Sequence, residues 1–245
     1  NCSGISSLTI PRSVKIIGAK AFNNITNLTS VFFNAENCVI GDTKSPFVGC
    51  NSLKTITFDE NLKTIPGYVC ANMSFSSITI PKTVTTIGEK AFYLCSNLKS
   101  ITLPNSLTTI GNSAFESCSN HESITLPNSL TAIGSSAFGS CSKLTKASIP
   151  NSVTTIGSYA FDGCSKLESI TLPDSLSTIE GYTFRSCKVL QKIDIPGAVT
   201  SIGENAFEGC SALTEVILPD SVTSIGENAF KGCSALTEVI LPDSV

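Results

Sequence analysis

The sequence predicts a single α/β repeat array, a solenoid in which short strands stack in parallel and each unit adds one helical or 3₁₀ turn. The first observation is that phenylalanine recurs with a step of 23 residues. The positions are Phe92, Phe115, Phe138, Phe161, Phe184, Phe207 and Phe230. Cysteine follows three residues after each of these, and proline recurs with the same step from Pro81 to Pro242. A fixed period of this length is typical of a solenoid, because one unit cannot bury its apolar side chains without stacked neighbours.

The second observation is the length of the chain. Dividing 245 residues by a period of 23 gives about 10.7, which predicts one array of about ten complete units over residues 1–245. Units over 1–80 are irregular: two residues are added between Ile40 and Phe47, and the unit after Asp59 is one residue short, with Val69 or Cys70 in the phenylalanine place. Units over 81–245 are regular. Both ends fall within a unit, so we expect a fragment of a longer chain.

Each unit begins with a predicted strand. Ile101 and Leu103 flank Thr102, and this alternation predicts a strand with one buried face. Pro104 ends the strand because proline cannot donate to a ladder. A second short extended piece follows over 107–110. Stacked in parallel at about 4.8 Å, the first pieces form eleven strand segments, ending near residues 10, 33, 58, 80, 103, 126, 149, 172, 195, 218 and 241.

The rest of each unit is predicted to turn inward. Ala114, Phe115 and Cys118 lie at i, i+1 and i+4, which favours one turn of α or 3₁₀ helix facing the core. Nine of the eleven cysteines share this one column, and no Cys-x-x-Cys pair supplies zinc-ligand spacing. We therefore expect buried free thiols, although pairing of Cys38 or Cys70 remains an open alternative.

Composition argues against several functions. Lys and Arg number 16 against 19 Asp and Glu, so the basic excess of a nucleic-acid-binding protein is absent. No run approaches the roughly 20 apolar residues of a membrane span. A histidine metal centre or a Ser-His-Asp triad would need His121, which takes a leucine place in the repeat and is predicted to be a neutral packed side chain. We expect no catalytic residues, no metal site, no cofactor and no enzymatic activity.

A longer motif carries a resemblance. Residues 218–226 read Leu-Pro-Asp-Ser-Val-Thr-Ser-Ile-Gly, and 229–233 read Ala-Phe-Lys-Gly-Cys, followed by Leu236 and Val239. This pattern resembles the BspA-type leucine-rich repeat, also called the Treponema pallidum type, over essentially the whole chain. The resemblance implies a curved right-handed solenoid with a parallel sheet on its concave face. It also implies a cell-surface or secreted protein linked to adherence to host cells or matrix proteins, and it supplies no catalytic residues.

The outward strand positions are the candidate binding face. They carry small hydroxyl side chains in the middle of the array and other residue types toward the ends. The candidate residues are Phe32, Thr79, Thr102, Thr125, Lys146, Ser148, Thr171, Lys192, Asp194, Ile217 and Ile240. Two interpretations stay open: threonine favours strands for its own sake, or the hydroxyls form a platform for a protein or glycan ligand.

Departures from the hydroxyl pattern are the places to expect recognition. Phe32 is an apolar anchor unless the irregular units cover it. Ile217 and Ile240 form an apolar patch unless further chain packs on them. Charge is also uneven: residues 1–195 hold 15 basic and 12 acidic residues (+3), and 196–245 hold 1 and 7 (−6).

Two functions from different classes are compatible with these features. The first is an extracellular module that binds host cell-surface or matrix components through the strand face. The second is a structural spacer that displays another domain. We also expect end-to-end association of the isolated fragment, or a capping unit in the intact chain.

Overall fold

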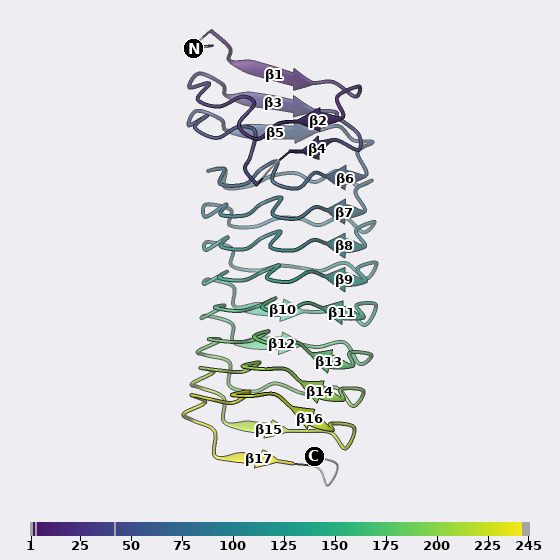
Figure 1. Ribbon diagram of the computed structural model, residues 1–245, viewed down its shortest axis with the longest axis vertical. Coiled ribbons are helices and arrows are strands. Elements are labelled where there is room, and N and C mark those ends of the chain that lie inside the picture. The colour runs from purple at the N-terminus through teal and green to yellow at the C-terminus, as the bar shows by residue number, and fades with distance from the viewer. Residues whose placement is uncertain (1, 3, 42, 242–245) are drawn as a thin grey trace.

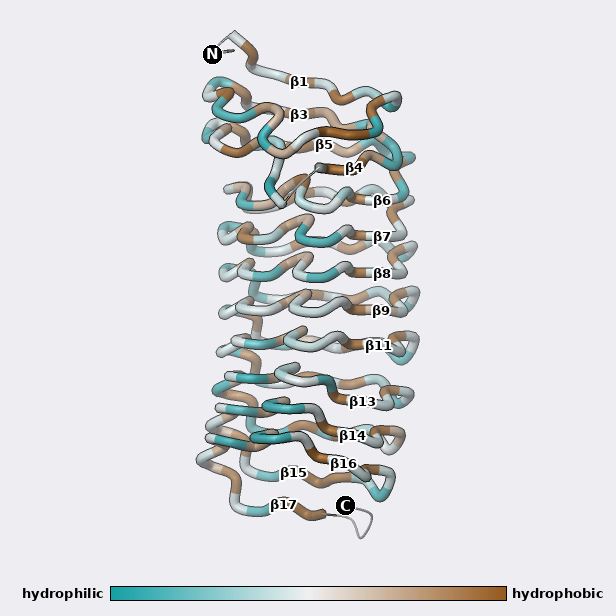
Figure 2. The backbone as a smooth tube through the Cα atoms, viewed as in Figure 1, coloured by the Kyte–Doolittle hydropathy of each residue, from teal (hydrophilic) through white to brown (hydrophobic). Residues whose placement is uncertain are grey.

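The computed structural model describes residues 2, 4–41 and 43–241, and it forms a parallel β-solenoid of about ten coils (Figure 1). β1 (Ser7–Ile10) lies at one end of the stack and β17 (Glu238–Ile240) at the other. Apolar segments recur at the same place in successive coils from β6 (Thr64–Ile65) to β16 (Ser224–Ile225) (Figure 2). The repeat period read from the sequence is therefore the period of the coil.

Two ladders of parallel strands run along the stack. The first ladder contains the strand that opens each unit, namely β1, β3 (Ser30–Phe33), β5 (Thr55–Phe58), β10 (Lys146–Ser148), β12 (Ser169–Thr171), β15 (Glu215–Ile217) and β17. The second ladder contains two-residue strands, namely β2 (Ile16–Ile17), β4 (Val39–Ile40), β6, β7 (Thr86–Ile87), β8 (Thr109–Ile110), β9 (Ala132–Ile133), β11 (Thr155–Ile156), β13 (Thr178–Ile179), β14 (Ser201–Ile202) and β16.

The first ladder is interrupted, which the sequence did not predict. Its paired strands fall into the groups β1-β3-β5, β10-β12 and β15-β17. Near the interruptions, the described residues form isolated β-bridges between single residue pairs: Thr79↔Thr102, Ser123↔Lys146 and Lys192↔Glu215. The expected strands ending near residues 80, 103, 126 and 195 are therefore absent as strands, although their segments keep their places in the coils.

The prediction of a helical turn, and with it the α/β class, is wrong. Residues 2, 4–41 and 43–241 contain no helix. Lys90 has a φ of 52° and Leu94 has a φ of 58°. Both values lie in the left-handed region, which ends a right-handed helix. The amide of Phe92 donates to Ala114 O in the next coil (2.8 Å), while that of Ala91 closes a turn on Gly88 O (3.2 Å). Amides thus alternate between local turns and the neighbouring coil.

The inward direction of phenylalanine and cysteine is confirmed despite the different backbone. Phe115, Phe138 and Phe161 are fully buried. Their rings stack from coil to coil, with centroids 5.5 Å apart for Phe115–Phe138 and 5.4 Å for Phe138–Phe161. Offset-stacked aromatic pairs add about 0.5–1.5 kcal/mol beyond the burial of their area. The phenylalanine column therefore forms the spine of the core.

The cysteines, all of them in the described ranges, are free thiols, and every one except Cys2 is buried. From Cys118 onward each Sγ of this column donates to the carbonyl of the phenylalanine in the preceding coil, as from Cys118 to Phe92 O (3.2 Å) and from Cys141 to Phe115 O (3.2 Å). Cys95 Sγ donates to Cys70 O instead (3.0 Å). Burial raises the pKa of Cys95 and of Cys210 to about 12. These side chains are therefore neutral hydrogen-bond donors of the core at physiological pH.

The structure shows which residue takes the phenylalanine place in the unit that is one residue short, and where that unit lacks its residue. Cys70 takes the phenylalanine place, because its amide donates to Ala91 O (3.0 Å) as the amide of Phe92 donates to Ala114 O. The amide of Lys99 donates to Ser76 O (3.1 Å), which restores the 23-residue offset. The missing residue therefore falls just before Ser76, at the entry to the first-ladder segment of this coil.

Candidate functional site

The outer face of the first ladder holds every residue that the sequence predicts as a binding residue. In β5 the burial alternates: Thr55 and Thr57 are exposed, and Ile56 and Phe58 are buried. The same alternation exposes all the candidates, which are Phe32, Thr79, Thr102, Thr125, Lys146, Ser148, Thr171, Lys192, Asp194, Ile217 and Ile240. Their exposure is a finding, whereas their role in binding stays a prediction.

Threonine hydroxyls fall into two kinds according to their position along the coil. One position before a strand they bond to the preceding coil on both ladders: Thr108 Oγ1 donates to Thr85 O (3.0 Å) before β8, and Thr145 Oγ1 donates to Glu122 O (3.2 Å) before β10. Among the described residues, the first-ladder hydroxyls of Thr102, Thr125 and Thr171 make no hydrogen bond within the chain. The hydroxyls just before the strands therefore tie coils together, whereas the outward hydroxyls of Thr102, Thr125 and Thr171 remain available to a ligand or to water.

Two adjoining hollows open on this face beside β5. One has a volume of about 470 Å³ and the other about 1030 Å³, and they share Glu60, Ile78, Thr79 and Pro81. We call them together the β5 groove. It is lined by Thr55, Ile56, Thr57, Phe58, Glu60, Asn61, Ser77, Ile78, Thr79, Ile80, Pro81, Lys82, Thr83, Thr102, Leu103, Pro104 and Asn105. The groove coincides with the first interruption of the ladder.

An apolar side chain is uncovered in the groove. Ile78 is partly exposed, although its equivalents Ile101 and Ile124 are each 7% exposed. Phe32, which is 39% exposed, pairs in register with Thr57 at the side of the groove. The structure thus brings three predicted residues, Phe32, Thr79 and Thr102, around one concavity with an apolar floor.

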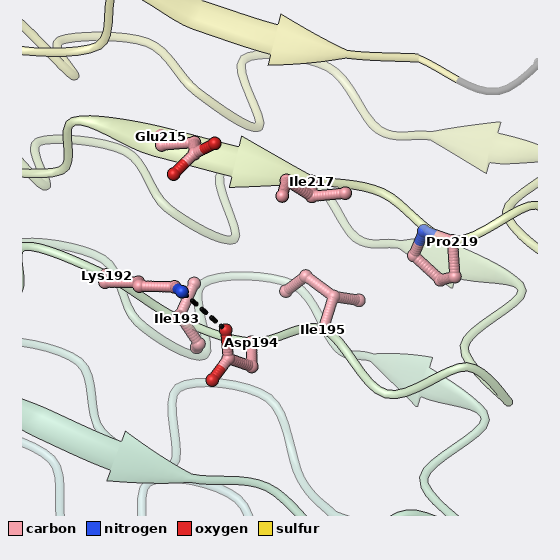
Figure 3. A pocket seen from close by; sticks show the side chains of 7 residues that line it. All are labelled: Lys192, Ile193, Asp194, Ile195, Glu215, Ile217 and Pro219. Carbon is pink, nitrogen blue, oxygen red and sulfur yellow. Dashed lines mark ion pairs between the residues drawn. The ribbon is translucent and has the colours of Figure 1, made fainter.

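A second, smaller hollow lies near the other end of the ladder (Figure 3). Its volume is about 240 Å³, and it is lined by Lys192, Ile193, Asp194, Ile195, Glu215, Ile217 and Pro219. Lys192 Nζ lies 3.4 Å from Asp194 Oδ1. An exposed ion pair of this kind contributes about 0–1 kcal/mol, so both charges can turn to a ligand at little cost.

Ile217 and Ile240 extend this region as an apolar stripe. The two residues are directly paired between β15 and β17, and they are 52% and 45% exposed. Glu215 and Glu238 are paired two positions earlier on the same strands. The acidic part of the chain therefore presents an apolar stripe next to a row of carboxylates.

A third surface feature is a cluster of Tyr159, Tyr182, Arg185 and Asp162, whose side chains contact one another. The rings of Tyr159 and Tyr182 stack at 4.4 Å, and the guanidinium of Arg185 lies 5.0 Å from the Tyr182 ring centroid. Arg185 also donates from Nε and Nη2 to the two carboxylate oxygens of Asp162, both at 2.8 Å. Sequence reasoning missed this cluster, which holds adjacent coils together rather than opening a site.

Metal-ligand clusters and His121 are the remaining places where the sequence raised the question of a metal or histidine site. Within the described ranges, no group of three or more His, Cys, Asp or Glu residues is placed to hold a metal ion. His121 is fully buried, stacks on Phe115 with centroids 6.3 Å apart, and has no hydrogen-bond partner at Nδ1 or Nε2. The packed position of this side chain is confirmed, and burial lowers the pKa of its imidazole, which favours the neutral form. Among the residues that the structure describes, no helix could cross a membrane.

Comparisons with known proteins identify relatives of the whole array. The family model described as "BspA type Leucine rich repeat region" matches in six copies over residues 1–94, 38–145, 63–189 and 131–245. No curated protein matches the sequence. A leucine-rich repeat protein from Bacteroides ovatus is similar in structure, with 26% identity and a TM-score of 0.70 over 100% of this chain and 75% of that chain.

Two further solved structures share the fold at lower identity. A leucine-rich cell surface protein from Faecalibacterium prausnitzii has 24% identity and a TM-score of 0.54, over 96% of this chain and 87% of that chain. The pneumococcal vaccine antigen PcpA has 23% identity and a TM-score of 0.58, over 96% of this chain and 67% of that chain. At these identities the likeness concerns the fold alone.

Proposed function

Because the chain belongs to the BspA-type leucine-rich repeat family, we propose that it is a non-catalytic recognition module at a cell surface or outside the cell. It binds a protein or glycan ligand through the outer face of the first ladder, and its target is a component of host cells or of the extracellular matrix. One relative with the same fold is described as a cell surface protein and another as a vaccine antigen, which supports an exposed location. A fold alone does not assign a ligand, so the face must carry the argument.

The observation that carries the proposal is the position of the larger hollows beside outward hydroxyls of the first ladder. The described hydroxyls of Thr102, Thr125 and Thr171 make no hydrogen bond within the chain, and Thr102 lines the β5 groove. Strand propensity explains threonine on either ladder equally well. It does not explain why the hollows of the β5 groove and of Lys192–Pro219 both lie on the first ladder.

A spacer that displays another domain is the second candidate. It is favoured by residues 196–218 and 219–241, which differ at only three positions (197/220, 198/221 and 208/231). Such near-identity gives these two coils nearly the same surface, as expected of a repeating spacer. End-to-end association of copies of the chain stays a prediction.

A binding experiment with matched variants tests recognition against the spacer. The chain is applied to immobilised extracellular-matrix proteins, cultured host cells and a glycan array. The test variant carries Thr102→Lys, Thr125→Lys and Thr171→Lys, and the control carries Thr155→Lys, Ser177→Lys and Ser224→Lys at exposed positions of the second-ladder side. We expect saturable binding that falls at least about tenfold, or 1.4 kcal/mol, in the test variant only.

The other outcomes are equally clear. Equal loss in both variants would point to a general effect of added charge, and binding unchanged in both would move the site away from the first ladder. Binding to none of the three targets would favour the spacer.

A further inference from the structure

The edge of β5 that faces the groove has no strand partner. In a parallel ladder, alternate residues direct their backbone N–H and C=O groups to opposite neighbours. The amide of Thr55 donates to Thr29 O (3.4 Å) and that of Asp59 to Phe33 O (2.9 Å), so the odd-numbered residues face β3. The backbone groups of Ile56 and Phe58 therefore face the other side. Within the described residues β5 ends its sheet, and no strand pairs with that side.

This free edge lies on the largest concavity of the first-ladder face described above. Ile56 and Phe58 line the hollow of about 470 Å³, together with Ser77 and Thr79 of the next coil. Figure 1 labels no strand of this ladder between β5 and β10, so the interruption extends over several coils of the described chain. Exposed strand edges are templates for pairing with another chain unless charge, proline or a covering segment blocks them.

Side chains around the edge provide contacts of different kinds. Ile78 and Pro81 form an apolar floor, and the exposed ring of Phe32 lies beside Thr57. Glu60 and Lys82, of opposite charge, both line the end of the groove near the strand exits. An extended chain lying along β5 would place alternate side chains toward the floor and toward solvent.

We propose that the β5 groove captures an extended polypeptide segment of another protein, which adds to the edge of β5 as an extra strand. The inference rests on the proposed recognition function and gives it a partner class. Main-chain hydrogen bonds to Ile56 and Phe58 supply affinity, as in other cases of strand addition, and the apolar floor supplies selectivity for alternate side chains. A glycan lacks the evenly spaced N–H and C=O groups that this edge would pair with.

The test uses the intact chain and a phage-displayed library of random linear dodecapeptides. Enriched peptides are synthesised, and their affinities are measured for the wild type, for Thr79→Arg and for Thr155→Arg. Both threonines are exposed, but Thr155 lies in β11 of the second ladder and only Thr79 lines the β5 groove. Thermal melts check that both variants fold. Each peptide is also made with N-methyl groups at successive backbone positions, which removes one amide donor at a time and leaves the side chains unchanged.

We expect peptides that bind the wild type and Thr155→Arg equally and lose at least about tenfold in affinity for Thr79→Arg. N-methylation should weaken binding at alternate positions only, because only alternate residues face β5. Equal affinity for all three proteins, or insensitivity to N-methylation, would overturn the inference. No enriched peptide, together with saturable binding of matrix proteins, cells or glycans, would overturn it while the proposed function stands. Groove-dependent peptides without any such target would support the groove and contradict the surface-adhesion role.

Discussion

Replacing Phe138 with alanine should lower the free energy of unfolding by about 3–5 kcal/mol, the usual cost of removing a buried phenylalanine. Its ring is fully buried and stacks on Phe115 and Phe161, so the change removes contacts on both sides of the coil. In a solenoid each coil contacts only its neighbours, and a cavity in the middle weakens the coupling between the two halves. Urea denaturation followed by circular dichroism should therefore show a lower midpoint and a broader or divided transition.

Phe32→Ala is the matched control for this measurement. Phe32 is 39% exposed on the first-ladder face, so its removal should cost less than about 1 kcal/mol. Equal destabilisation by Phe32→Ala and Phe138→Ala would contradict the assignment of the phenylalanine column as the spine of the core.

Replacing His121 with leucine should raise the free energy of unfolding by about 1–3 kcal/mol at neutral pH. Both imidazole nitrogens are buried without a hydrogen-bond partner, and a buried unsatisfied polar group carries a penalty of about that size. Leucine is the residue of this column in the neighbouring units, as at Leu98 and Leu144, which are both fully buried. The gain should be measured by urea denaturation of the wild type and His121→Leu.

The same substitution should change the pH dependence of stability. Burial lowers the pKa of His121 below its ordinary value of 6.5. Below about pH 6.5 the unfolded chain binds more protons at this residue than the folded chain, so wild-type stability falls as the pH drops. The difference between His121→Leu and the wild type should therefore widen from pH 7.5 to pH 5.

Glu122→Gln provides the control for this titration. Glu122 is the nearest acidic residue in sequence, but its side chain is exposed. We expect this variant to keep the acid sensitivity of the wild type. A stability difference between His121→Leu and the wild type that is constant with pH would show that His121 is not the group that titrates.

The columns of the repeat could be predicted from the sequence because each one repeats the same physical requirement. Phe115, Cys118 and Ile101 are buried, and Thr102 is exposed, as the 23-residue pattern requires. The helical turn could not be predicted reliably, since residues at i, i+1 and i+4 face one side in a helix and in successive tight turns alike. The left-handed conformation that separates the two falls on ordinary residues such as Lys90 and Ser113, which carry no glycine signal.

The β5 groove is harder to predict from the sequence than the columns of the repeat. Residues 123–126 and 169–172 both read Ser-Ile-Thr-Leu, yet Ser169–Thr171 forms the paired strand β12, whereas Ser123 makes an isolated bridge. Pairing on the first ladder is therefore decided by how whole coils stack and not by the local tetrapeptide. The one-residue-short unit before Ser76 was the available signal that the coil after β5 departs from its neighbours.

Hydrogen exchange of the chain with and without a ligand from the binding experiment tests the recognition face most directly. Recognition through the first ladder predicts slower exchange on binding over 53–60, 76–83 and 99–105, which contain β5 and the segments that line its groove. Exchange over 88–95, in the turns around Lys90 and Leu94, should stay unchanged. Protection confined to those turns or to the second ladder would contradict the assignment of the first-ladder face as the binding surface.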